Sequence, residues 1–97
     1  MYVVIFRANV RQFDVEYAQI AQRMRDLAIG QFGCLEFFSV TEGTQEVALS
    51  YWNDEASIKA WKAHSEHIVA QQLGRERWYE SYAVQVAQIT REYRVDT

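Results

Sequence analysis

The sequence predicts an α+β protein of the ferredoxin-like type, in which a four-stranded antiparallel sheet carries both helices on one face. The first observation is the order of the segments, which alternate between strand-like and helix-like patterns as βαββαβ. The second is the length of 97 residues without proline or a visible linker, which fits one domain over residues 1–97. The third is that the predicted strands are apolar on both faces, which a single chain does not explain.

The first half of the predicted fold is one strand followed by one helix. The stretch "YVVIFRAN" at residues 2–9 is β-branched and aromatic, as strands are. Residues 14–28 then carry apolar side chains at helical spacing. Asp14 suits the N-cap of this helix, and Gly30 and Gly33 follow its end.

The second half repeats the pattern with a hairpin in front. Residues 34–41 and 46–52 are predicted strands, and the polar loop between them contains Gly43. A second helix over residues 53–74 begins near Asn53 or Asp54 and is closed by Gly74. Residues 80–93 complete the fold as a long last strand.

Composition narrows the range of functions. The net charge of −3 argues against nucleic acid or an anionic membrane as a partner, because both attract clustered Lys and Arg. Cys34 is alone, so neither an internal disulfide nor a cysteine-based metal site is expected. The N-terminal segment resembles neither a signal peptide nor a membrane span. These features together predict a cytoplasmic protein.

The apolar character of both strand faces indicates a partner subunit. In the first strand, Tyr2, Val4 and Phe6 point to one face, and Val3 and Ile5 point to the other. Helices on one face leave the other apolar face uncovered, whereas a solvated face should be polar. We therefore expect a homodimer that packs sheet against sheet around a barrel-like interior. An exposed apolar face that binds a ligand is the alternative.

The second predicted helix carries the candidate site. Trp61, His64, Ile68 and Gln71 fall on one side of the helix and form a stripe with two polar members. Such a stripe is typical of a pocket wall that binds a small molecule. The alternative is that Trp61 is ordinary core and that His64 is a half-exposed histidine without a role.

Three other kinds of residue are candidates for a functional role: the histidines, Asn9 and Cys34. His64 and His67 could share a metal ion, but no third ligand is apparent, so no metal site is expected. Asn9 ends the first strand, where its amide either meets a substrate oxygen or caps a turn. Cys34 is a candidate nucleophile or, more simply, a small buried side chain.

These residues resemble the antibiotic biosynthesis monooxygenase domain family of the dimeric α+β barrel group. The similarity spans the chain and rests on the βαββαβ order and on three stretches: "FRANV", "SYWNDEASIKAWKAH" and "GRERWYESYAVQVAQITREY". Members include cofactor-free monooxygenases that oxidise phenols or quinols, haem-degrading monooxygenases and proteins of unknown role. The resemblance implies a dimeric barrel and an oxygenase-type pocket.

The haem-degrading branch differs from this sequence at one informative position. That branch has an Asn near the end of the first strand, which Asn9 matches, and a Trp in the second helix, which Trp61 matches. It has an iron-binding His ten residues after the Trp, where Gln71 stands here. A glutamine amide is a poor iron ligand. The departure favours cofactor-free oxidation over haem degradation.

The resemblance, with this departure, therefore implies a cofactor-independent monooxygenase that uses O₂ to oxidise a small aromatic phenol or hydroquinone. Asn9 would stabilise the substrate anion, Trp61 would stack on the ring, and His64 would act as the base. Ile68, Gln71 and Arg75 would complete substrate binding, Arg75 or Arg77 by attracting the anion. Haem as a substrate is the first alternative, and a non-catalytic dimer that binds a small molecule is the second.

Overall fold

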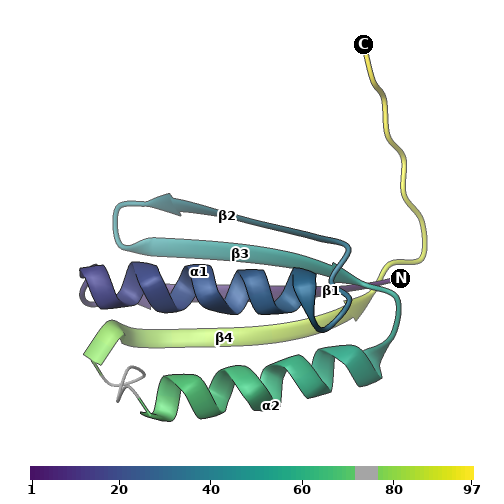
Figure 1. The fold of residues 1–97 in the computed structure, drawn as a ribbon. Coiled ribbons are helices and arrows are strands. Elements are labelled where there is room, and N and C mark those ends of the chain that lie inside the picture. Colours follow the sequence, from purple (N-terminus) through teal and green to yellow (C-terminus); the bar gives the residue numbers. More distant parts are fainter. Residues whose placement is uncertain (72–76) are drawn as a thin grey trace.

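The protein folds as a sheet with two helices on one side (Figure 1). The computed structural model describes residues 1–71 and 77–97, and for residues 67 and 69–71 it describes the backbone alone. The elements follow in the order β1 (Tyr2–Val10), α1 (Val15–Gly30), β2 (Glu36–Glu42), β3 (Gln45–Trp52), α2 (Glu55–Gln71) and β4 (Tyr79–Gln88). The predicted βαββαβ order is confirmed.

The four strands form one antiparallel sheet in the order β2-β3-β1-β4. β1 pairs with both of its neighbours, so that Phe6 lies opposite Ala48 on β3 and Val84 on β4. β1 and β3 are therefore the central strands, and β2 and β4 form the edges. In the part of the chain that is described, no helix is long and apolar enough to cross a membrane.

Both helices begin at a capping aspartate. The side chain of Asp14 accepts a hydrogen bond from the backbone N–H of Tyr17 at 2.7 Å, and Asp54 does the same for Ser57 at 2.7 Å. Asp14 also binds the guanidinium of Arg77 at 2.6 Å, which ties the start of α1 to the segment before β4. The hydrogen bond from Arg77 holds the pKa of the Asp14 carboxyl below its usual range. The predicted cap at Asp14 is confirmed, and Asp54 is the residue that caps α2.

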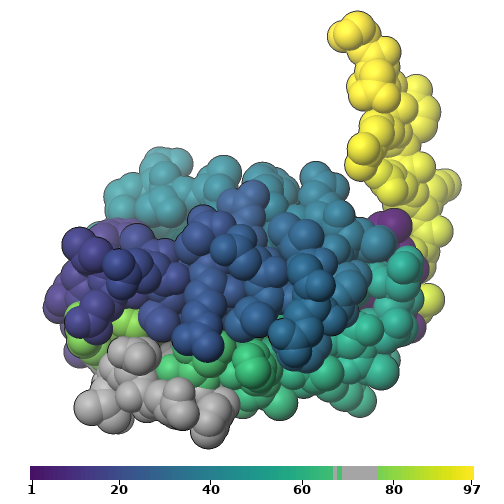
Figure 2. Space-filling model, in the orientation of Figure 1, coloured from purple at the N-terminus to yellow at the C-terminus, as the bar shows by residue number. Residues whose placement is uncertain are grey.

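The last strand is shorter than predicted. The expected strand over residues 80–93 ends at Gln88, and residues 89–97 leave the body of the protein as an extended segment (Figure 2). The reason is the length of the partner strand: Gln88 pairs with Tyr2, the first residue of β1. Beyond that point, among the described residues, one further backbone hydrogen bond joins the two strands, from the N–H of Ile89 to the carbonyl of Met1 at 2.9 Å. A strand pattern in the sequence cannot continue a sheet whose neighbour has ended.

The two faces of the sheet differ in what covers them. Val4, Ala8 and Val10 of β1 lie under the helices and are buried. Val3 and Ile5 alternate with them along the strand and therefore point to the opposite face. Neither helix covers that face (Figure 1). Phe38 and Val40 of β2 share this uncovered face and are exposed. The prediction that the strands are apolar on both faces is confirmed.

The layer between the sheet and the helices contains two groups of buried residues. We call the first the Tyr17 cluster; it comprises Ala8, Val10, Tyr17, Ile20, Ile68 and Trp78. We call the second the Trp52 cluster; it comprises Val4, Ala28, Cys34, Trp52 and Ile58. The candidate site lies between these clusters.

Candidate functional site

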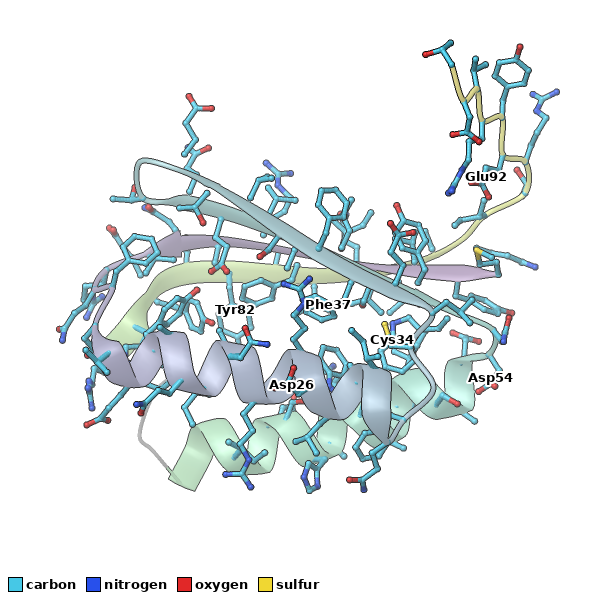
Figure 3. All side chains as sticks on the ribbon, turned by 45° about the horizontal axis from the view of Figure 1, so that its top comes forward. Asp26, Cys34, Phe37, Asp54, Tyr82 and Glu92 are labelled. Atoms are coloured by element: carbon cyan, nitrogen blue, oxygen red, sulfur yellow. The ribbon has the colours of Figure 1, made fainter. Side chains whose placement is uncertain are left out.

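A cavity of about 240 Å³ lies between the sheet and the two helices. All four strands and both helices contribute to its lining. Its lining is largely apolar and aromatic, with a few polar side chains, as small-molecule sites generally are. Phe37 of β2 and Tyr82 of β4 both point from the sheet into this layer (Figure 3).

Trp61 of α2 is held in place at one end of the cavity by three contacts. Its indole N–H donates to the backbone carbonyl of Met24 on α1 at 2.9 Å. Its ring packs against Trp52 with centroids 5.4 Å apart and meets Phe37 edge-on at 6.1 Å. A fixed aromatic surface of this kind can receive a flat ring.

Tyrosines surround the other end. Phe6 stacks on Tyr82 at 5.9 Å and meets the edge of Tyr79 at 5.5 Å. Tyr17 of α1 contacts Tyr79 at 5.9 Å. All four of these aromatic residues line the cavity.

Glu46 is the carboxyl group that β3 contributes to this aromatic cavity. It stands opposite Ala8 of β1 and is in phase with Ala48, Ser50 and Trp52, which face the helices. The hydroxyl of Tyr17 donates a hydrogen bond to its Oε2. A carboxyl group so placed can accept a proton from a bound molecule and share it with the tyrosine.

The titration of these groups reflects their burial. Burial raises the pKa of Glu46 above its ordinary value, because a carboxylate is poorly solvated there. Burial also raises the pKa of Tyr79 far above that of a free tyrosine, with the charge of Glu46 as a second cause. Groups with shifted pKa values in an apolar cavity are candidates for proton transfer.

The mouth of the cavity runs along β4. Tyr82, Val84 and Val86 line the cavity and yet remain 41%, 40% and 45% exposed, because neither helix covers this edge strand fully. Lys62 and Glu66 of α2 also line the cavity, and their charged ends are 3.9 Å apart in a solvent-exposed pair. The entrance is thus apolar on the sheet side and carries paired charges on the helix side.

Two of the predicted site residues, Trp61 and Ile68, lie on the side of α2 that faces the sheet. Trp61 lines the cavity, as expected of a stacking residue. Ile68 faces the sheet but belongs to the Tyr17 cluster, so it contributes to the core rather than to the lining.

His64 lies outside the cavity, which corrects its predicted place in the pocket wall. The buried side of α2 is formed by Ile58, Trp61, Ser65 and Ile68. At about 100° per residue, His64 stands roughly 80° from the centre of that side. Its half-buried ring packs instead against Phe32 at 5.6 Å.

Asn9 lies on the wrong face of the sheet for the predicted role. It alternates with Ala8 and Val10, which are buried under the helices, so its side chain points to the uncovered face. There its amide donates to Oε2 of Glu80 at 3.2 Å. The structure therefore does not bring Asn9 together with Trp61, and neither Asn9 nor His64 lines the cavity, so their catalytic roles stay predictions.

The remaining predictions fall on other parts of α2 and the segment after it. The side chains of His67 and Gln71, and the whole of Arg75, lie outside the described residues. Arg77 forms ion pairs with Asp14 at 2.6 Å and with Glu16 at 3.0 Å. Arg77 is thus part of a surface ion-pair network at the start of α1.

Sequence reasoning missed Glu46, although the sequence contains a signal for it. The residue occupies the same strand face as Ala48 and Trp52, where an apolar side chain is expected. A charged residue in phase with buried positions costs stability unless it has a function or a partner. The alternation of inward and outward side chains along β3 could therefore have identified Glu46 as a candidate.

The fold and the cavity define an α+β protein that can enclose a small, largely apolar molecule. No family model matches the sequence. The uncharacterized protein YqjZ of Bacillus subtilis (strain 168) is 41% identical over 92 residues, which cover 94% of this chain and 81% of that protein. The jasmonate monooxygenase ABM of Pyricularia oryzae is 33% identical over 99 residues; the match covers 97% of this chain but only 46% of that longer protein.

The solved structures share the fold. SnoaB, a cofactor-independent oxygenase from Streptomyces nogalater, superposes with a TM-score of 0.74 over 94% of both chains at 14% sequence identity. The 33% identical monooxygenase and the shared fold confirm the resemblance of this chain to the antibiotic biosynthesis monooxygenase domain family.

Proposed function

We propose that the protein is a cofactor-independent monooxygenase that oxidises a small aromatic phenol or hydroquinone with O₂. The observation that carries this proposal is the Glu46 carboxyl, which is hydrogen-bonded to Tyr17 within an aromatic cavity. The names of two similar proteins support an oxygenase: one is a jasmonate monooxygenase and the other a cofactor-independent oxygenase.

The first step would be binding of the flat ring beside Trp61 and Phe37. The indole is fixed by its bond to the Met24 carbonyl, so it does not need to be ordered when a ligand arrives. A volume of about 240 Å³ is below the ~300–1,000 Å³ of pockets for drug-sized ligands, which favours one or two rings. Haem is larger than this, so the cavity favours the phenolic substrate over haem.

The second step would be deprotonation of the substrate by Glu46. The raised pKa of this carboxyl brings it closer to that of a phenol and makes proton transfer less uphill. The Tyr17 hydroxyl would hold the carboxylate in position and would keep donating a hydrogen bond after the transfer. The electron-rich anion would then react with O₂.

The oxidation would balance without a cofactor. A phenol would give up the hydrogen of its hydroxyl group and the hydrogen of one ring carbon, together with all the electrons required to reduce O₂. One oxygen atom would form the new carbonyl group, and the other would leave as water. The protein would supply binding, proton transfer and exclusion of bulk water.

The test is oxygen uptake by the purified protein with a panel of hydroquinones and naphthols. Glu46→Gln should slow uptake by about 10²–10⁴-fold, the usual loss when a general base is removed. Glu42→Gln, an exposed glutamate on β2, is the matched control and should retain the natural rate. His64→Ala should also retain it. Ligand binding without oxygen uptake would instead identify a small-molecule-binding protein.

The pH dependence tests the same assignment. Uptake should rise with pH through the raised pKa of Glu46, because the base must be ionised. Tyr17→Phe should move this rise to higher pH, since a hydrogen bond to a carboxylate lowers its pKa and the variant lacks that bond. An unchanged profile in Tyr17→Phe would argue against Glu46 as the base.

A homodimer through the uncovered face of the sheet belongs to the same proposal. Ile5, Leu49 and Phe38 lie side by side on that face, in neighbouring strands. A second copy of the sheet is the simplest cover for such a surface. Sedimentation velocity should show a dimer at micromolar concentration, and Leu49→Lys should convert it to a monomer. Gln19→Lys, on the exposed side of α1, should leave the dimer intact.

A further inference from the structure

Ser65 is a buried polar residue of α2 without a hydrogen-bond partner. It is 7% exposed and lines the cavity, one turn after Trp61. Among the described residues its hydroxyl oxygen has no donor or acceptor within reach. A serine inside a helix commonly bonds the carbonyl four residues earlier, which here belongs to Trp61, but Ser65 does not.

A hydroxyl in this state is costly unless something binds it. Buried polar groups are nearly always paired, and an unpaired one loses its bonds to water without replacement. In the wall of a ligand cavity this cost is offset when a bound ligand supplies the missing hydrogen-bond partner.

The position of Ser65 relative to Glu46 indicates what kind of ligand that is. Glu46 belongs to the sheet, which forms one wall of the cavity, and Ser65 belongs to α2, which forms another. A molecule lying between the sheet and α2 can meet the carboxyl with one oxygen and the serine hydroxyl with a second.

We propose that Ser65 determines substrate specificity by hydrogen-bonding a second oxygen of the substrate, separate from the one that Glu46 deprotonates. This inference rests on the proposed function for the role of Glu46. A serine hydroxyl both donates and accepts, so it can bind a second hydroxyl or a carbonyl group. A substrate analogue without that oxygen would leave Ser65 unpaired and would bind more weakly.

Binding to matched probes tests the inference without any turnover. Affinities for 2-naphthol and for a set of naphthalenediols are measured by calorimetry under nitrogen, so that oxidation cannot contribute. The natural protein should bind at least one diol about 10-fold more tightly than 2-naphthol, the gain of one good hydrogen bond. Ser65→Ala should abolish that preference and bind 2-naphthol at least as tightly as the natural protein does.

Two variants separate a lost hydrogen bond from a general disturbance. Ser65→Thr keeps a hydroxyl and should keep the preference. Ser81→Ala removes an exposed serine from β4 and should change nothing. Thermal unfolding of Ser65→Ala should occur at the same or a higher temperature, because the variant buries no unpaired hydroxyl.

The failures of the two proposals can be told apart. Equal affinity of the natural protein for every probe, no binding of any probe, or a preference that survives Ser65→Ala would overturn the role of Ser65. Glu46→Gln does not bear on that result. Conversely, a Ser65-dependent preference without oxygen uptake in air would retain the binding role and overturn the oxygenase.

Discussion

Two buried serines face the layer between the sheet and the helices, and they differ in their hydrogen bonding. Ser50 of β3 is 2% exposed and accepts a hydrogen bond from the indole N–H of Trp52 at 2.8 Å. Ser65 of α2 is 7% exposed and has no partner among the described residues. Ser50 thus provides an acceptor for a buried N–H group of the core. The Ser65 hydroxyl, beside the cavity, remains able to form a hydrogen bond. The difference separates a structural polar group from one available to a ligand.

The surroundings of the two serines show the same division. Ser50 lies beside the Trp52 cluster, where large apolar side chains close around one another. Ser65 lines the cavity together with Glu46, whose pKa is raised by burial. Stability should therefore depend most on the first region, and ligand binding on the second.

The largest expected effect on stability is that of Trp52→Ala. Trp52 has no exposed surface and is among the largest fully buried side chains. Its truncation should lower the free energy of unfolding by about 3–5 kcal/mol. Urea unfolding followed by circular dichroism measures this. Tyr93→Ala, in the exposed C-terminal segment, is the control and should stay within about 0.5 kcal/mol of the natural protein.

Ser50→Ala should be the next most damaging change, and it compares the two serines directly. It leaves the Trp52 indole N–H buried without an acceptor, which should cost about 1–3 kcal/mol in free energy of unfolding. The same substitution at Ser65 removes a group that already lacks a partner and should cost nothing. Equal losses in the two variants would contradict the distinction between the serines.

Trp61→Phe should have a moderate effect. The variant loses the bond to the Met24 carbonyl and part of the contact with Trp52, at a cost of about 1 kcal/mol in stability. It retains an aromatic ring at the cavity wall. Calorimetric affinity for the preferred probe should therefore fall less in Trp61→Phe than in Trp61→Ala. Equal losses of affinity would remove Trp61 as a stacking surface.

The smallest effect is a pH-dependent one at Glu46. Its pKa is higher in the folded protein than its ordinary value of 4.5, so its protonated form favours folding. That contribution is full below about pH 4.5 and is lost as pH rises through the raised pKa. Glu46→Gln cannot ionise, so its stability relative to the natural protein should increase as pH rises.

Urea unfolding at a series of pH values from about 4 to 8 measures the difference. Glu42→Gln provides the comparison, since Glu42 is exposed on the edge strand β2. A stability difference between Glu46→Gln and the natural protein that does not change with pH would mean that Glu46 is well solvated. Glu46 would then lack the raised pKa on which its role as a base depends.

Local patterns in the sequence determined the order of elements and the two apolar faces of the sheet. A period of two along β1 and β3 and a helical period in the two helices depend only on backbone geometry. The aspartate caps at Asp14 and Asp54 likewise act over three residues, so they can be recognised in the chain itself. The same periodicity also placed Trp61 and Ile68 on the inner side of α2.

Tertiary structure alone decided which residues form the site. The rotation of α2 about its axis is set by packing against the sheet, and it turned Ser65 inward and His64 toward Phe32. The side of the sheet that the helices cover decided that Asn9 faces away and that Glu46 faces the cavity. The end of β1 at Tyr2 stopped β4 at Gln88. Each outcome depends on contacts between segments distant in the chain, which local periodicity does not specify.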